Sequence, residues 1–107
     1  MIFRGAIHEL KAMPGARGHE QQGHRYAVVV QSDQFATSLV TVAMTSTSAV
    51  PTVYRPELEL DGKTTRILTD QIYSVDPGSR FGAFKGALEA HELIELDRAL
   101  MLKLGLF

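Results

Sequence analysis

The pattern of apolar residues in this 107-residue chain changes once, near residue 89, and that change narrows the folds open to the chain. Before it, short runs rich in valine, isoleucine, leucine and threonine are separated by turn signals such as Asp61-Gly62. After it, leucines recur at helical spacing from Leu93 to Leu104, with charged residues between them. Several strands followed by one amphipathic helix predict a mainly β (α+β) domain, a small antiparallel barrel with the helix packed on it.

Six runs are expected to be strands, namely residues 5–10, 25–31, 39–45, 53–60, 66–75 and 81–87. Pro56 cannot donate a backbone hydrogen bond, so the fourth run is expected at an edge of the sheet. Asp76-Pro77-Gly78 is expected to be a turn that closes the fifth run. Residues 89–104 are expected to form the helix, which ends at Gly105 and has a poor N-cap at its start.

The length and composition exclude several classes of protein. The chain fits a single domain over residues 1–107. It has no cysteine, which excludes disulfides, thiolate metal sites and a cysteine nucleophile. No apolar run has the length of a signal peptide or a membrane span, so a cytoplasmic protein is expected. The net charge of −1 argues against a broad contact with duplex nucleic acid, so any nucleic-acid binding is expected at a local patch that contacts the bases of a short single strand.

A glycine-rich polar loop at residues 13–23 runs directly into a strand with three consecutive valines. The loop brings polar and charged side chains next to a rigid element, where binding and catalysis concentrate. His19 and His24 are five residues apart and flanked by glycines, whereas the zinc-protease motif places two histidines four apart on a helix. No metal site is expected. The chain also lacks the glycine motifs that bind nucleotide phosphates, and no cofactor is expected.

Arg25 and Thr45 stand at the ends of two of the expected strands. The forked guanidinium of Arg25 is suited to clamp a phosphate, and the alternative is an ordinary exposed surface charge. Thr45 is followed by Ser46, Thr47 and Ser48, and the alternative role of these residues is a solvated turn whose hydroxyls bond the local backbone. The residues alone leave both alternatives open.

Three groups of residues form a pattern along the chain. They are Arg4-Gly5 followed by Gly18-x-Glu20-Gln21-x-Gly23-x-Arg25, then Val42-Ala43-Met44-Thr45, and then Asp70-Gln71-Ile72. This pattern resembles the MazF/PemK family, the endoribonuclease toxins of type II toxin–antitoxin systems. The resemblance implies an SH3-like barrel (CcdB/MazF/PemK-like) that forms a homodimer. It also implies sequence-specific cleavage of single-stranded RNA by 2′-hydroxyl attack without a metal ion, and inhibition by a cognate antitoxin with an acidic C-terminal tail.

The resemblance also assigns roles to single residues. The catalytic arginine of the family falls on Arg25 and its catalytic threonine on Thr45. The glutamate that helps to shape the family's site falls on Glu20, and the glutamine of the third motif falls on Gln71. Tyr26 departs from the pattern, since the family usually has proline after the arginine.

The general base must be unprotonated near neutral pH, so that it can accept the proton of the 2′-hydroxyl. Arginine holds its proton up to a pKa above about 12, so His24 and Glu20 are the candidate bases. Stacking on an RNA base is the alternative role of His24. Gln22, Ser46 and Gln71 are candidate RNA-binding residues.

Two other functions compete with RNA cleavage. A CcdB-like toxin shares the fold class and binds DNA gyrase through a tail that ends in Trp-Gly-Ile. This chain ends in Leu104-Gly105-Leu106-Phe107 and has no tryptophan, which ranks the gyrase-binding toxin below an endoribonuclease. The third alternative is a non-catalytic SH3-like binding module, and the presence of both Arg25 and Thr45 argues against it.

Overall fold

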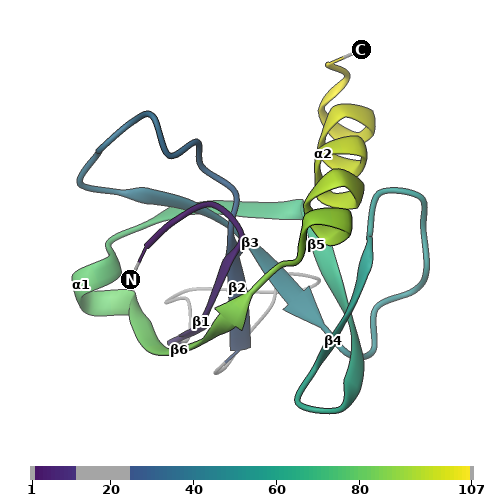
Figure 1. Ribbon diagram of the computed structural model, residues 1–107, viewed down its shortest axis with the longest axis horizontal. Helices are drawn as coiled ribbons and strands as arrows, with labels where there is room; N and C mark the ends of the chain where they lie inside the picture. The colour runs from purple at the N-terminus through teal and green to yellow at the C-terminus, as the bar shows by residue number, and fades with distance from the viewer. Residues whose placement is uncertain (1, 12–24, 107) are drawn as a thin grey trace.

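The computed structural model describes residues 2–11 and 25–106, which form one curled sheet with a long helix against it (Figure 1). The elements in chain order are β1 (Ala6–Leu10), β2 (Arg25–Val29), β3 (Val40–Ser46), β4 (Glu57–Leu60), β5 (Lys63–Val75), α1 (Pro77–Arg80), β6 (Phe81–Ala87) and α2 (Ala90–Leu104). The strands follow the order β4-β5-β3-β2-β1-β6, and each pairing is antiparallel. This curled half-barrel with a C-terminal helix confirms the predicted fold class.

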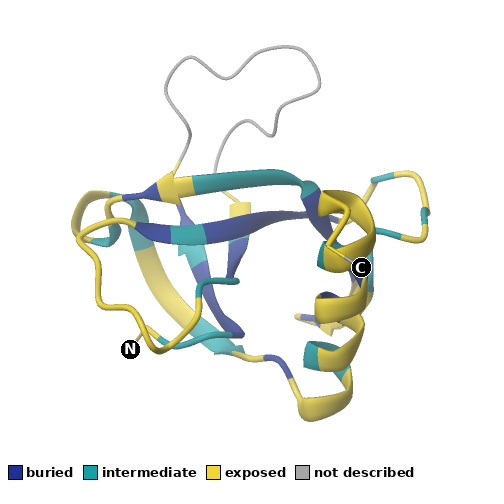
Figure 2. Ribbon diagram, turned by 90° about the horizontal axis from the view of Figure 1, so that it is seen from above, coloured by how far each residue is buried: buried dark blue, intermediate teal, exposed yellow. Residues whose placement is uncertain are grey.

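The central strands β2 and β3 are buried on both faces, which explains their nearly unbroken runs of apolar residues. Ala27, Val29 and Val42 belong to one apolar cluster, whereas Val28 belongs to a second cluster. Because successive side chains of a strand point to opposite faces, the two clusters lie on opposite faces of the sheet. Leu96 of α2 completes the second cluster, and Figure 2 shows the helix with its exposed side turned away from the sheet.

The edge position predicted for the fourth strand is confirmed, because β4 is the outermost strand beside β5. Pro56 lies just before β4, and its carbonyl oxygen accepts a bond from the amide of Ile67 at 2.8 Å. A two-residue turn joins β4 to β5, and Asp61 and Gly62 have φ angles of 53° and 74°. Positive φ at both central residues is the type I′ geometry, which matches the twist of the two strands.

The turn at Asp76-Pro77-Gly78 closes β5 as predicted, but the expectation of a poor N-cap for α2 was wrong. Asp76-Pro77-Gly78 does more than turn the chain, because it begins the single helical turn α1, with the carboxylate of Asp76 accepting a bond from the amide of Gly78 at 3.1 Å. The start of α2 is capped, because the Glu92 side chain accepts a bond from the amide of Glu89 at 2.8 Å. In the described part of the chain, no helix is long and apolar enough to cross a membrane.

The apolar stripe of α2 is only partly covered by the sheet. Leu96 is fully buried, and Leu93 and Leu100 are half-buried. Leu104 remains 54% exposed, and Ile94 on the same helix is 58% exposed. The helix therefore presents apolar surface to its surroundings as well as to the core.

Candidate functional site

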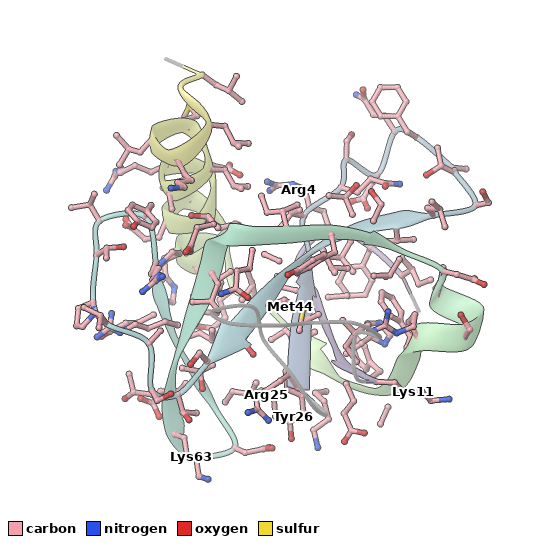
Figure 3. The ribbon with its side chains drawn as sticks, turned by 180° about the vertical axis from the view of Figure 1, so that it is seen from behind. Arg4, Lys11, Arg25, Tyr26, Met44 and Lys63 are labelled. Carbon is pink, nitrogen blue, oxygen red and sulfur yellow. The ribbon has the colours of Figure 1, made fainter. Side chains whose placement is uncertain are left out.

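Several strand ends meet at one end of the curled sheet and surround a pocket of about 430 Å³. Neighbouring antiparallel strands run in opposite directions, so the ends of β1, β3 and β4 lie beside the beginnings of β2 and β5. Figure 3 shows Arg25, Tyr26 and Lys63 together at this end of the molecule. Thr65 and the hydroxyl residues 45–48 also line the pocket. Its volume is within the range of pockets that hold small ligands.

The pocket carries charges of both signs. Arg25 is the first residue of β2 and Lys63 the first residue of β5, and both are exposed cations on its wall. Glu9 of β1 and Asp61 of the β4–β5 turn place carboxylates on the same wall. A guanidinium and an ammonium beside hydroxyl groups can hold a phosphate, whereas a carboxylate needs a hydrogen-bond donor opposite it.

Thr45 is only 2% exposed, and its hydroxyl already has a partner within the protein. Its Oγ1 donates a hydrogen bond to the carbonyl oxygen of Tyr26 at 2.8 Å. The β2–β3 register, which pairs Ala27 with Met44, explains this contact, because it brings the preceding residue of β2 opposite the following residue of β3. In this geometry the Thr45 oxygen can accept a further bond, but it can donate to a ligand only after its hydroxyl turns.

The serines that follow Thr45 form a local turn. The Oγ of Ser46 accepts a bond from the amide of Ser48 at 3.1 Å and lies 3.4 Å from the Oγ of Ser48. The local backbone bonding that the sequence left open is therefore confirmed for Ser46, although this residue is buried rather than solvated. Ser46 and Ser48 also line the pocket, so the turn shapes its wall.

The side chain of Tyr26 connects β2 to the β4–β5 turn. Its hydroxyl donates to Oδ2 of Asp61 at 2.8 Å, and Nζ of Lys85 in β6 lies 3.9 Å from the same oxygen. Lys85 also lies over the Tyr26 ring, with its Nζ 5.6 Å from the ring centroid. The hydrogen bond to Asp61 is the largest cause of a raised pKa for Tyr26, because a phenolate beside a carboxylate is unfavourable.

The predicted site residues have different outcomes. The structure brings Arg25, Thr45 and Ser46 to one pocket. Gln71 is half-buried in β5 and is not among the residues that line this pocket. Glu20, Gln22 and His24 lie outside the described residues. Within residues 2–11 and 25–106, no three metal-ligating side chains of histidine, aspartate or glutamate come together.

Sequence reasoning misses three charged residues of the pocket, namely Glu9, Asp61 and Lys63. The Asp61-Gly62 turn signal predicts a hairpin but not which end of the sheet the hairpin occupies. That information depends on the strand order, in which β5 lies between β4 and β3.

Asp70, the first residue of the third motif, forms an ion pair elsewhere on β5. Arg55 donates to its two carboxylate oxygens, from Nε at 3.2 Å and from Nη2 at 2.8 Å. These hydrogen bonds hold the pKa of Asp70 below its ordinary value. Nη1 of Arg55 also donates to the carbonyl oxygen of Val50 at 3.0 Å, so the pair fastens the segment before β4 to β5.

Comparison with known proteins gives a match over nearly the whole chain. The family described as PemK-like, MazF-like toxin of type II toxin–antitoxin system matches residues 3–104. Rv3098A of Mycobacterium tuberculosis (strain ATCC 25618 / H37Rv), whose name describes a candidate toxin, is 42% identical over 106 residues. The alignment covers 99% of this chain and 100% of that protein.

Solved structures share the fold. The crystal structure of MazF from Deinococcus radiodurans has a TM-score of 0.81 and 27% identity, and the match covers 97% of this chain and 96% of that one. An endoribonuclease from a mycobacterial species, solved in complex with its cognate antitoxin, has a TM-score of 0.80 and 16% identity. That match covers 100% of this chain and 98% of the other. The barrel and its helix are thus a shared architecture.

Proposed function

Because this chain belongs to the PemK-like, MazF-like toxin family of type II toxin–antitoxin systems, we propose that it is an endoribonuclease that cleaves single-stranded RNA. The proposed cleavage is sequence-specific and needs no metal ion. Two of the solved structures with this fold are endoribonucleases from mycobacterial species.

The observation that carries the proposal is the shared pocket of Arg25 and Thr45. These residues are 20 positions apart in the sequence and reach the pocket from the beginning of β2 and the end of β3. Lys63 adds a second cation on the same wall. Two cations and a row of hydroxyls suit a phosphodiester, whose transition state carries more negative charge than its ground state.

The proposed reaction uses the 2′-hydroxyl of the RNA as its nucleophile. The 2′-oxygen forms a bond to phosphorus and loses its proton to a base, while the bond from phosphorus to the 5′-oxygen breaks and that oxygen takes up a proton. The products are a 2′,3′-cyclic phosphate and a 5′-hydroxyl end. Arg25 stabilises the charge on the non-bridging oxygens in this reaction, since a guanidinium presents several N–H donors in a planar fork.

Thr45 supports the phosphate site through its buried hydroxyl. In the described state that hydroxyl donates to the Tyr26 carbonyl, and a phosphate oxygen entering the pocket would compete for the same proton. We assign the proton transfers to His24, with Glu20 as the other candidate, because imidazole titrates near neutral pH. Gln22, Ser46 and Gln71 are the proposed RNA-binding residues, and of these Ser46 lines the pocket.

The proposed partners follow from the family. A cognate antitoxin with an acidic tail would compete with RNA for Arg25 and Lys63, and solved relatives of this fold include MazF bound to MazE from Deinococcus radiodurans. A homodimer of the single domain over residues 1–107 would cover the exposed leucine side chains of α2. The toxin would act in the cytoplasm, where its RNA substrates are found.

A gel assay tests the proposal directly. Purified protein is incubated with a mixed-sequence single-stranded RNA in excess EDTA, and the fragments are compared with those of Arg25→Ala. We expect discrete fragments from the wild type, and a rate at least about 100-fold lower for Arg25→Ala, which is the usual loss when a preorganised charge donor is removed. Arg98→Ala is the matched control, because Arg98 is an exposed arginine of α2 that pairs with Glu95.

A modified RNA and two contrary outcomes make the assay decisive. An RNA with a single 2′-deoxyribose at the cut position should stay intact, since it lacks the nucleophile. Equal cleavage by the wild type and Arg25→Ala would exclude Arg25 from the reaction. An intact RNA with all proteins would overturn the proposed cleavage and favour a toxin that acts by binding another protein.

A further inference from the structure

The carboxylate of Asp61 is an unexpected group in a pocket proposed to hold RNA. It lines the pocket together with Arg25 and Lys63, and its side chain is 54% exposed. A carboxylate repels the phosphate groups of a polyanion, so its presence is favourable only where it faces hydrogen-bond donors of the ligand. In RNA, donors of this kind are the N–H groups of the bases.

The position of this carboxylate is fixed from three sides. The type I′ turn sets its backbone, with φ of 53° at Asp61. The Tyr26 hydroxyl donates to Oδ2 at 2.8 Å, and Lys85 lies 3.9 Å from the same atom. A carboxylate offers about four lone-pair sites, so Oδ1 and the remaining lone pair of Oδ2 are still able to accept bonds from a ligand.

An aromatic wall stands next to the carboxylate. Tyr26 lines the pocket and is half-buried, and Nζ of Lys85 lies 5.6 Å from the centroid of its ring. Unpaired RNA bases commonly stack on aromatic side chains while their Watson–Crick edges form hydrogen bonds. Tyr26 and Asp61 therefore offer both parts of a base-binding site within one hydrogen-bonded unit.

The order of donors and acceptors selects one base. Lys85 is a donor and Asp61 is an acceptor with two oxygens, and they are neighbours. The Watson–Crick edge of guanine has the complementary order, with the O6 acceptor followed by the N1–H and N2–H donors. Uracil has a single donor between two carbonyls, and adenine and cytosine each place one amino group beside unprotonated acceptors.

We propose that Asp61, Tyr26 and Lys85 form a subsite for one unpaired guanine of the RNA. In this subsite the carboxylate accepts bonds from N1–H and N2–H, the ammonium donates to O6, and the ring packs against the base. The inference rests on the proposed function, since Tyr26 and Asp61 line the proposed RNA pocket and Lys85 lies beside them.

Binding of RNA that cannot be cut tests the subsite separately from cleavage. The probes are 2′-O-methyl pentanucleotides of sequence UUXUU, labelled with a fluorophore, in which X is guanine, inosine, adenine, cytosine or uracil. Inosine differs from guanine only by the missing 2-amino group. We expect the guanine probe to bind about tenfold more tightly than the inosine probe, as measured by fluorescence anisotropy, which is typical of one good base contact.

Variants assign the preference to named residues. Asp61→Asn replaces one acceptor oxygen by a donor, and its affinities for the guanine and inosine probes are expected to become equal within about twofold. Glu59→Gln is the matched control, because Glu59 is an exposed carboxylate on β4 of the same hairpin and accepts a bond from the Thr64 hydroxyl. It should keep the guanine preference of the wild type. Tyr26→Phe keeps the aromatic ring but removes the hydroxyl that holds the Asp61 carboxylate. A smaller guanine preference in this variant supports the role of the Tyr26 hydroxyl in positioning Asp61.

The outcomes separate this inference from the proposed function. A guanine preference that Asp61→Asn removes supports the subsite even if the matching unmodified RNA is not cut, in which case only the proposed cleavage fails. Equal affinity of the wild type for the guanine and inosine probes would overturn the subsite, even if other RNA is cleaved. A preference that persists in Asp61→Asn would also overturn it.

Discussion

The hydroxyl of Thr45 donates a 2.8 Å hydrogen bond to the carbonyl oxygen of Tyr26, and this bond joins the two strands that carry the proposed phosphate-binding residues. Tyr26 in turn donates from its side chain to Asp61 at 2.8 Å. Tyr26 thus positions two parts of the pocket wall. Its backbone carbonyl holds Thr45, and its phenol holds the β4–β5 turn. A change at Tyr26 or its partners is expected to affect both stability and the shape of the pocket.

Thr45→Val tests how much the hydrogen bond between Thr45 and Tyr26 contributes to stability. Valine keeps the branched shape but has no hydroxyl, so the Tyr26 carbonyl loses the partner that the almost fully buried Thr45 supplies. We expect the free energy of unfolding, measured by urea denaturation, to fall by about 1–2 kcal/mol. RNA cleavage should fall as well, by far more than the small unfolded fraction can explain.

Thr45→Ser is the matched control for this prediction. Serine keeps the hydroxyl and loses only the methyl group, so it should restore cleavage even if its stability remains below that of the wild type. If Thr45→Val cleaves RNA as fast as Thr45→Ser, the hydroxyl of Thr45 has no part in the reaction.

The phenol of Tyr26 is expected to ionise at higher pH than an ordinary tyrosine. Its bond to Asp61 raises its pKa, because the neutral phenol donates to the carboxylate and the phenolate cannot. The stability contributed by this bond is therefore complete below about pH 10, the ordinary tyrosine pKa, and is lost as the pH rises through the raised value. Titration of absorbance at 295 nm measures the ionisation, and subtracting the curve of Tyr26→Phe isolates this residue. Asp61→Asn should lower the pKa of Tyr26, and an unchanged value would show that the two groups are not coupled in solution.

The sequence predicted the elements of this fold better than their ends. Apolar alternation in β5 becomes clear only at Ile67, so the strand was predicted to begin at Arg66, although it begins at Lys63. Lys63 and Thr64 at the start of β5 pair only with β4 in the described sheet and are exposed, so polar residues are acceptable there. The helix α1 was missed because a helix of four residues is too short to show a periodic pattern.

The candidate site could be predicted only in part, for a different reason. Arg25 and Thr45 stood out because of their residue types and the resemblance to a family. The strand order brings Asp61 and Lys63 to the same end of the sheet as Arg25 and Thr45. The contact of Thr45 with Tyr26 depends on the register of β2 and β3. Both are properties of long-range pairing, and local patterns of apolar and turn residues do not encode them.

Gly5 and Gly62 offer a comparison between backbone strain alone and strain combined with crowding. Both have positive φ, 90° and 74°, where a side chain costs about 1–2 kcal/mol. A Cβ at Gly62 would meet nothing within 4 Å, whereas a Cβ at Gly5 would lie 3.1 Å from Cδ2 of Leu93 in α2. We expect Gly62→Ala to lower the free energy of unfolding by about that amount and Gly5→Ala to lower it further, as measured by urea denaturation. Equal losses would show that Leu93 moves aside without cost.

Asp70→Asn is expected to destabilise the protein at neutral pH and to flatten the acid side of its stability profile. The two hydrogen bonds from Arg55 favour the charged carboxylate, so the pKa of Asp70 is lower in the folded than in the unfolded chain. Its contribution is present above the unfolded pKa of about 3.9 and is lost as the pH falls through the lowered folded value. Replacing the carboxylate should cost about 1.5–3 kcal/mol at pH 7, the range for hydrogen bonds to charged groups, and clearly less below pH 3.

Urea denaturation of the wild type and Asp70→Asn across this pH range measures the difference, and Glu95→Gln is the control. Glu95 pairs with Arg98 on the exposed surface of α2, where both side chains are more than half exposed, so its loss should cost less than about 1 kcal/mol. Its acid profile should follow that of the wild type. If Asp70→Asn and Glu95→Gln lose the same small amount of stability at pH 7, the fork between Arg55 and Asp70 does not fasten the segment before β4 in solution, and that segment must be held by other contacts, such as the bond from the Thr69 hydroxyl to the carbonyl oxygen of Tyr54.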